Sequence, residues 1–319
     1  MTSPACVVGV DLGGTKLLAG VVDARLNVHH RTQRTIAGLG QAALLDAVAD
    51  AVTEVGDLSG IEPSAAGFGI PALIDRRTGT AAACVHLPLE GVAFGDLMAE
   101  RLDLPCVVDN DANMAALAEH RFGAARGVAH AIVLTIGTGI GSGLILNGAL
   151  YRGAIGAGGE LGHMVVDADG PLCQGACPNR GCLEAVASGS ALVREARREA
   201  SSLPASALGQ VLSAGREVSG PMVTELAHDG DVAAQRAIAR IGSQLGAGLS
   251  SIANIFNPEL IVIGGGVIAA GELLLTPARE ELERRALAPN AELVRVVPAQ
   301  FGAEAGMLGA ATLAREELG

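Results

Sequence analysis

Apolar runs of strand length alternate in this chain with stretches whose apolar residues recur at helical spacing. Residues 6–10 and 17–22 are apolar runs on either side of a Gly-Gly pair, and this pattern predicts a β-hairpin. The same patterns predict further elements in the first part of the chain. These are helices at 41–55, 94–102 and 111–120, a strand that enters a loop at 65–74, and a strand at 105–108.

The arrangement of strand, glycine turn and strand occurs a second time. Residues 131–135 and 144–146 are apolar, and they enclose the glycine-rich segment 136–143. Gly13 and Gly137 are therefore equivalent points, and their wide separation suits a duplicated domain because solenoid repeats are shorter. The remaining predicted elements are helices at 191–201, 230–256, 271–285 and 305–317, and a buried strand at 260–263.

Composition narrows the class of protein. The 319 residues are enough for two domains. Hydrophobic residues make up 50% of the chain and charged residues 18%, and this composition favours a folded chain over disorder. The net charge of −12 argues against nucleic acid and anionic membrane as partners. Residues 1–10 lack the features of a signal peptide, and the uncharged stretches 127–151 and 241–258 fit a buried core better than lipid. A cytoplasmic protein is expected.

The first glycine turn carries groups suited to phosphate. Gly13, Gly14 and Thr15 offer backbone N–H donors and a hydroxyl at close range. Asp11 offers the oxygen ligands that Mg²⁺ prefers. Lys16, the only lysine among 22 basic residues, can meet a phosphate as a point charge. An ordinary hairpin has the same pattern, and the chain shows neither a P-loop nor a Rossmann motif here.

Two later glycine segments also allow close approach of a nucleotide. Thr138 and Gly139 lie in the second glycine turn, and Gly264, Gly265 and Gly266 follow a buried strand. Each segment also fits a plain tight turn.

Asp111 lies where a predicted strand gives way to a predicted helix. A carboxylate at this place often caps the helix N-terminus. It can also act as a base that accepts the proton of a sugar hydroxyl while a phosphoryl group is transferred.

A histidine and three cysteines form the strongest local motif. His163, Cys173, Cys177 and Cys182 make up a Cys₃His set, which is a closed ligand set of structural zinc. Proline, asparagine, arginine and glycine are among their neighbours, whereas inert free thiols usually lie in an apolar core. Glu160 and Glu184 flank this set, and their carboxylates can bind sugar hydroxyls, as can the second ring nitrogen of His163. Ordinary surface carboxylates would look the same.

Five motifs in this order together resemble the ROK family of repressors, open reading frames and kinases. They lie at residues 11–16, 110–113, 135–139, 159–163 and 181–184. The resemblance covers nearly the whole chain and implies an α/β, actin-like ATPase (ribonuclease H-like) fold with two α/β domains and a cleft between them. The expected domains are a small one, 1–112 plus 303–319, and a large one with the zinc-binding loop, 113–302.

The same resemblance implies an ATP-dependent hexose kinase with Asp111 as its catalytic base. The sugar contacts that it implies are Gly69, Asn110, Asp111, Glu160, His163 and Glu184. ATP phosphates are expected near residues 11–16 and Thr138, adenosine is expected near 264–266, and Mg²⁺ and structural Zn²⁺ are the other cofactors. Family members are commonly homodimers or homotetramers.

The chain departs from the family pattern at two points. Three residues separate Cys173 from Cys177, where the family usually has one. The zinc is still expected at these cysteines, with a loop that differs from the usual one. His86 precedes Leu87 where an asparagine is common, which leaves sugar specificity open. Glucose is the first expectation, and mannose, fructose, N-acetylmannosamine, amino sugars and pseudo-sugars are alternatives.

Other functions in the family are less well matched. A repressor needs a winged helix before its ATPase core, and the glycine hairpin here begins at residue 11. A sugar sensor without activity has no need of Asp111. Polyphosphate fits less well as the phosphoryl donor, because the sequence shows no strongly basic track that could bind it.

Overall fold

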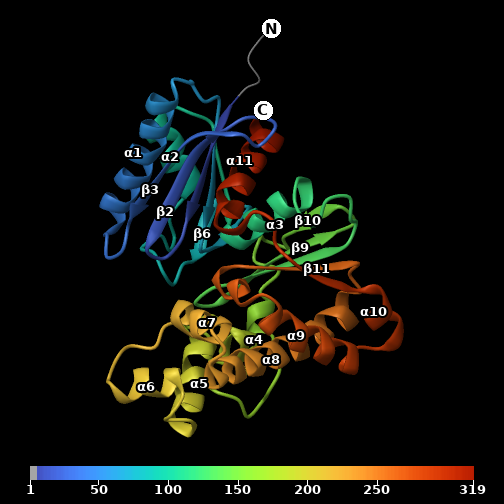
Figure 1. Cartoon of the computed structure of the whole chain (residues 1–319). Helices are drawn as coiled ribbons and strands as arrows, with labels where there is room; N and C mark the ends of the chain where they lie inside the picture. Colours follow the sequence, from blue (N-terminus) through green and yellow to red (C-terminus); the bar gives the residue numbers. More distant parts are fainter. Residues whose placement is uncertain (1–5) are drawn as a thin grey trace. The chain divides into compact units, whose positions relative to one another are not determined.

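The computed structural model describes residues 6–319 and divides them into two compact units. The first unit comprises residues 6–127, Gly143–Gly159 and Gln300–Gly319, and the second comprises Val128–Ser142 and Glu160–Ala299. Both combine strands and helices, as Figure 1 shows by colour along the chain. The α/β class predicted from the sequence is therefore confirmed.

The first unit contains a five-stranded sheet with the order β3-β2-β1-β4-β7. The strands are β1 (Val7–Leu12), β2 (Lys16–Val22), β3 (Val28–Thr35), β4 (Ala66–Ile70) and β7 (Cys106–Asn110). β1 and β2 form the predicted antiparallel hairpin, and β1, β4 and β7 run parallel. Two short strands, β5 (Leu73–Asp75) and β6 (Thr80–Ala83), pair separately.

Helices cover both faces of this sheet. The helices are α1 (Gln41–Ser59), α2 (Phe94–Leu102), α3 (Asp111–Arg121) and α11 (Ala305–Leu318). One apolar cluster joins strand residues to Leu44 of α1 and Phe94 of α2. A second cluster joins other strand residues to Ala118 of α3 and Met307 of α11. Because successive strand residues point to opposite faces, β1 can contribute to both clusters.

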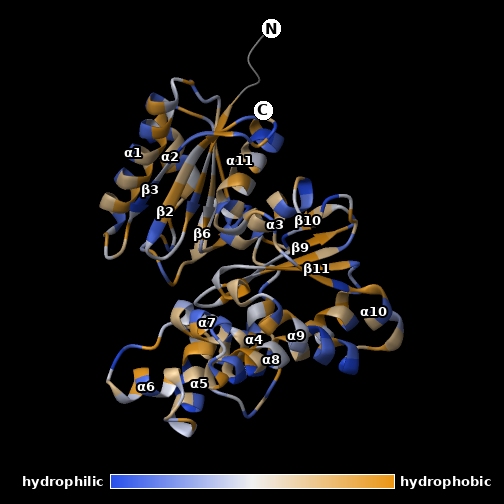
Figure 2. Ribbon diagram, in the orientation of Figure 1, coloured by the Kyte–Doolittle hydropathy of each residue, from blue (hydrophilic) through white to orange (hydrophobic). Residues whose placement is uncertain are grey.

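The second sheet repeats the topology of the first. Its order is β10-β9-β8-β11-β12, so both sheets arrange their strands as third, second, first, fourth and fifth in chain order. The strands are β8 (Ala131–Ile136), β9 (Ile140–Leu146), β10 (Ala149–Tyr151), β11 (Leu260–Gly264) and β12 (Arg295–Pro298). Figure 2 shows β9 and β11 largely in the colour of hydrophobic residues. The equivalence of Gly13 and Gly137 follows, since each lies between the first and second strand of its sheet.

The second unit also holds most of the helices. They are α4 (Leu183–Ala187), α5 (Gly189–Ser202), α6 (Ala207–Ser213), α7 (Gly220–His228), α8 (Val232–Phe256), α9 (Glu272–Arg285) and α10 (Ala288–Leu293). Short 3₁₀ turns are η1 (Leu161–His163), η2 (Gly266–Ala270) and, in the first unit, η3 (Gly302–Glu304). Within residues 6–319, no helix combines the length and apolar character needed to cross a bilayer.

Most predicted elements are confirmed, with a few differences. The helix predicted at 94–102 has the same bounds in the structure. The helix predicted at 230–256 begins at Val232, because the side chain of Asp231 caps it by accepting from the Ala234 amide. The strand entering a loop that was predicted at 65–74 is confirmed as β4, which ends at Ile70 before Pro71, but the separate short strand β5 was not predicted.

Candidate functional site

Three residues lie side by side where parallel strands of the first sheet end. Asp11 on β1 is opposite Gly69 on β4, and Gly69 is opposite Asp109 on β7. Ligands of open α/β sheets usually bind at the carboxyl ends of the strands. The fold therefore brings the predicted Asp11 and Gly69 to the edge from which α3 begins with Asp111.

Asn110 is the N-cap of α3. Its Oδ1 accepts hydrogen bonds from the amides of Ala112, at 2.9 Å, and Asn113, at 3.1 Å. Asp111 follows as the first helical residue, and its Oδ1 also accepts from the Ala112 amide, at 2.9 Å. The capping function is thus filled by Asn110, so capping alone does not account for a carboxylate at position 111.

Burial and, to a smaller extent, the nearby charge of Asp111 together raise the pKa of Asp11 to about 7. Two carboxylates close enough to affect each other's ionisation form a natural cation site. Oxygen ligands of this kind suit Mg²⁺.

The first glycine turn is closed by its own backbone. The Gly13 amide donates to the carbonyl of Lys16, at 2.8 Å, within the hairpin. Gly14, Thr15 and Lys16 are exposed and remain as candidate phosphate contacts. His86 lies against the turn, because a Cβ atom at Gly14 would be 3.3 Å from that of His86. The residue that departs from the family pattern is thus next to the predicted phosphate site.

The four predicted zinc ligands come together in the second unit. The ligand atoms of His163, Cys173, Cys177 and Cys182 all lie within 4.8 Å of one another. The Cys177 and Cys182 sulfurs are 3.9 Å apart, and the Cys173 sulfur is 3.5 Å from His163 Nδ1. A tetrahedral zinc with Zn–S bonds of about 2.3 Å separates its sulfur ligands by about 3.8 Å. The donor set and its spacing therefore fit zinc.

Thiol groups are crowded in this cluster. Burial, together with hydrogen bonds to Cys182 and Cys177, raises the pKa of Cys173 to about 12. A bound cation reverses this effect, because it stabilises thiolates.

The segment with the three cysteines, residues 173–182 (the cysteine loop), and the helix α4 that follows it both contact the second glycine turn. Glu184, in the first turn of α4, accepts a hydrogen bond from the Ile140 amide through Oε2, at 2.8 Å, and its Oε1 is 3.8 Å from the Cys173 sulfur. A Cβ atom at Gly139 would lie only 2.2 Å from Glu184 Oε2, so this close approach requires glycine. Gln174, which the sequence did not single out, donates to the carbonyl of Thr138 at 3.3 Å.

Glu160 lies directly before the 3₁₀ turn that carries His163. Its carbonyl accepts from the His163 amide, at 3.1 Å. Glu160, His163 and Glu184 thus belong to the same unit and surround the cysteine loop, while Gly69, Asn110 and Asp111 belong to the other unit.

A cavity of about 650 Å³ opens beside the second glycine turn. Gly264 is opposite Thr135 in the parallel pair of β11 and β8, which places the 264–266 glycines at the same edge as that turn. The cavity is lined by residues of both glycine segments, α5 and α7, among them Thr138, Gly189, Gly266, Thr224, Glu225 and His228. Its size suits a nucleoside.

The α7 wall of this cavity was missed by sequence reasoning. His228 Nε2 lies 3.1 Å from the carbonyl oxygen of Ala269 and so joins α7 to η2. No phosphate motif or charge cluster marks this helix, so the sequence held no signal for it.

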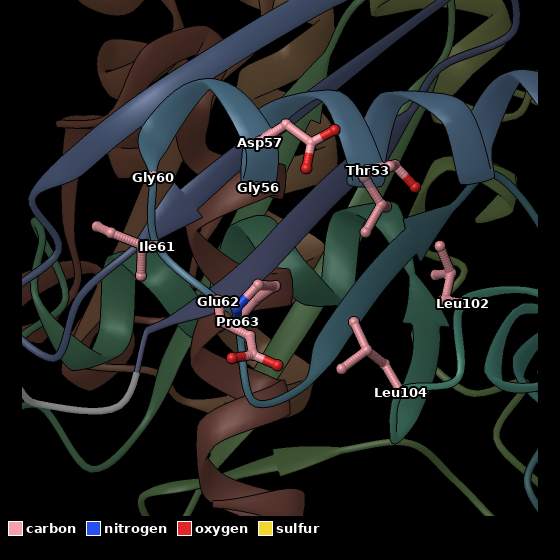
Figure 3. Close-up of a pocket in the computed structure, with 10 residues that line it drawn as sticks. Thr53, Gly56, Asp57, Gly60, Ile61, Glu62, Pro63, Leu102 and Leu104 are labelled. Atoms are coloured by element: carbon pink, nitrogen blue, oxygen red, sulfur yellow. The ribbon is translucent and has the colours of Figure 1, made fainter.

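A separate pocket of about 380 Å³ lies in the first unit, at the C-terminal end of α1 (Figure 3). Leu102 and Leu104 form its apolar wall, and its polar side chains Thr53, Asp57 and Glu62 are exposed. None of the predicted site residues lines it. We place no chemistry there.

Comparison with known proteins agrees with this geometry. The model of the ROK family matches residues 7–317. The chain is 36% identical to a glucokinase of Streptomyces coelicolor over 315 residues, 97% of each protein, and 35% identical to a glucokinase of Thermotoga maritima over 98% of each. The crystal structure of a ROK family glucokinase from Streptomyces griseus, in complex with glucose and AMPPNP, is similar with a TM-score of 0.88. It is 35% identical, and the match covers 98% of this chain and 100% of that one. From the motifs, the repeated sheet topology and these full-length similarities, we conclude that the chain belongs to the ROK family.

Proposed function

We propose that this protein is an ATP-dependent sugar kinase and that its sugar is glucose. The observation that carries the proposal is the position of Asp111, at the start of a helix capped by Asn110 and close enough to Asp11 to influence its ionisation. Phosphoryl transfer to an alcohol needs a carboxylate base beside a site for Mg²⁺ and phosphate. The similarity to glucokinases over the full length supports the same activity.

Asp111 is proposed to accept the proton of the sugar hydroxyl that attacks the γ-phosphorus of ATP. The other sugar hydroxyls are assigned to Asn110, Glu160, His163 and Glu184, with the backbone at Gly69 completing the contacts. Carboxylates and amides with fixed geometry fit hydroxyl groups, which both donate and accept.

The phosphates of ATP are assigned to both glycine turns. In the first turn the exposed Gly14, Thr15 and Lys16 bind them, while the Gly13 amide holds the hairpin closed. Thr138 and Gly139 bind them in the second turn, and the cavity beside Gly264, Gly265 and Gly266 takes the adenosine. Mg²⁺, held by Asp11 through water, would neutralise charge on the transferred group.

Zinc bound by His163, Cys173, Cys177 and Cys182 would be structural. With four protein ligands it has no open position for chemistry. Its proposed effect is to fix the loop that carries Gln174 and the start of α4 that carries Glu184, since both residues contact the second glycine turn.

Three further properties stay proposals. We expect a homodimer or homotetramer, no nucleic-acid partner, and a cytoplasmic location. The domain boundaries expected from the sequence, 1–112 plus 303–319 and 113–302, stay a prediction.

Another sugar remains the second candidate. It is favoured by His86, which lies against Gly14 in place of the usual asparagine.

The test is ADP release with ATP and Mg²⁺ across a panel of hexoses, amino sugars and polyols. A strong rate with glucose is expected. A strong rate only with another sugar would replace glucose but keep the kinase. No rate with any sugar, from folded protein that binds one of them, would reject the proposal.

A further inference from the structure

Asp109 is a buried carboxylate beside the proposed base. Its side chain is only 2% exposed. Oδ1 accepts hydrogen bonds from the Asn110 amide, at 2.7 Å, and from the side-chain amide of Asn113, at 3.0 Å. Both donors belong to the junction of β7 and α3. One oxygen of Asp109 therefore holds the backbone on one side of Asp111 and a side chain on the other.

The second oxygen of Asp109 faces two arginines. Arg152 donates to Oδ2 through Nε, at 2.5 Å, and Arg76 donates through Nη1, at 3.4 Å. A buried carboxylate needs such partners, because burial of an unpaired charge is strongly unfavourable. Both arginines also reach Glu317 near the end of α11, at 3.1 Å from Arg76 and 3.8 Å from Arg152. The four side chains form a neutral set of two cations and two anions.

The arginines tie Asp109 to segments that are distant along the chain. Arg76 follows β5, and its amide donates to the carbonyl of Ile155, at 2.9 Å. Arg152 follows β10 and begins the segment that continues to Glu160. The Asn110 side chain also donates to the carbonyl of Ala72, at 3.4 Å. Asp109 is thus the point at which the loops after β5 and β10 and the start of α3 are joined.

We propose that Asp109 is a positioning residue for phosphoryl transfer: it holds Asn110 and the first turn of α3 so that the Asp111 carboxylate has a fixed place. The inference rests on the proposed kinase function. A displacement of about 1 Å at a reacting group can lower a rate about 100-fold. Loss of Asp109 should therefore lower kcat more than it weakens sugar binding.

The variant that tests this is Asp109→Asn, which keeps the shape and one oxygen but leaves both arginines without their buried anion. The matched control is Glu317→Gln, which removes the partly exposed anion of the same two arginines. Each folded variant is measured for kcat and KM by ADP release and for sugar Kd by calorimetry. Amide hydrogen exchange of the peptide that spans residues 109–121 is measured in parallel.

For Asp109→Asn we expect kcat to fall at least tenfold, sugar Kd to change less than threefold, and exchange at residues 110–113 to become faster. Glu317→Gln should change each quantity less than twofold. A folded Asp109→Asn protein with kcat within twofold of the wild type, or with unchanged exchange, would overturn the inference. A Kd that rises as much as kcat falls would also overturn it, because that pattern indicates general loss of structure.

If Asp109→Asn does not fold, Arg76→Gln provides the same test from the surface. It should lower kcat about threefold or more and speed exchange at residues 110–113 without changing Kd, and no effect would overturn the inference. The wild-type assay separates the two proposals. If the wild type releases no ADP with any sugar, the kinase proposal fails, and the exchange measurement still decides whether Asp109 holds the start of α3.

Discussion

The carboxylate of Asp11 lies against the first turn of α11, in the space that a side chain at Gly306 would fill. A Cβ atom at Gly306 would be 2.4 Å from the carboxyl carbon and 2.6 Å from each oxygen of Asp11. The start of a helix offers partial positive charge, which favours a carboxylate. The C-terminal helix therefore fixes a residue that stands at the beginning of the chain.

Gly306→Ala is expected to displace the Asp11 carboxylate. Alanine in a helix is normally about 1 kcal/mol more favourable than glycine, so helix propensity by itself would stabilise the variant. A loss of function would instead come from the clash between the new Cβ and the Asp11 carboxylate. We expect kcat/KM for ATP to fall at least about tenfold, because a charged group is moved from its place. Steady-state kinetics with varied ATP will measure this.

A suitable control is Gly40→Ala, at the N-cap of α1, where an added Cβ meets no atom within 4 Å. Its kinetics should match the wild type. Unchanged kcat/KM for ATP in Gly306→Ala would show that the position of Asp11 does not matter.

The raised pKa of Asp11 predicts that stability falls with rising pH when divalent cations are absent. The carboxyl loses its proton near pH 3.8 in the unfolded chain and near pH 7 in the folded protein. Between these values the folded state binds more protons, so the free energy of unfolding decreases from about pH 4 to pH 7 and then levels off. In Asp11→Asn this contribution is absent.

Urea unfolding in EDTA at pH 5 and pH 8 checks this. The wild type should lose more stability between the two values than Asp11→Asn does. Equal losses would mean that Asp11 titrates at its ordinary value in the folded state.

Cys177→Ser should abolish zinc binding. Wild-type protein is expected to contain about one zinc per chain by metal analysis, and the variant close to none, with a Tm lower by about 5 °C or more. Because Gln174 lies in the same loop as Cys177, and Glu184 lies in α4 directly after it, KM for ATP and for sugar should both rise. A metal-free wild-type protein that is folded and active would contradict the assignment.

Cys106→Ser is the control for this change. Cys106 lies in β7, outside the cluster, and burial raises the pKa of its thiol to about 12. Its replacement should leave the zinc content unchanged.

Asp111→Asn should lower kcat about 1,000-fold while sugar Kd changes less than threefold. The amide keeps the size of the side chain but cannot accept a proton, and general bases typically contribute about 10²–10⁴ to rates. The control is Asp96→Asn, an exposed carboxylate in the first turn of α2. Turnover near the wild-type value in Asp111→Asn would exclude it as the base.

Local patterns in the sequence were enough for much of the fold. The hairpin of β1 and β2, the helix at 94–102 and the start of α3 each have a strong hydrophobic period or a junction motif of their own. β3 was missed because Val28 is the only apolar residue among its eight. That edge strand is held by its backbone hydrogen bonds with β2, and backbone pairing does not require a hydrophobic period in the sequence.

The candidate site was predictable where its residues form short motifs and not where it depends on distant contacts. The zinc ligands lie within one loop, so their spacing predicted the cluster. The arginine partners of Asp109 lie in the loops after β5 and β10, and no local pattern connects these loops with the end of β7. The hydrogen bond from the Gly13 amide to the Lys16 carbonyl could not be predicted from the motif either, since it depends on the closed shape of the turn.

The repeated strand order has an evolutionary consequence. A helix follows the fifth strand of each sheet, α3 after β7 and α11 after β12, as expected if an ancestral gene was duplicated and the copies fused. The copies have since diverged in different places. Between its third and fourth strands the second copy holds the cysteine loop and α4 to α8, where the first holds only α1. Only the first has a carboxylate directly after its fifth strand. Insertions could therefore accumulate in one copy without disturbing the carboxylate that follows the fifth strand of the other.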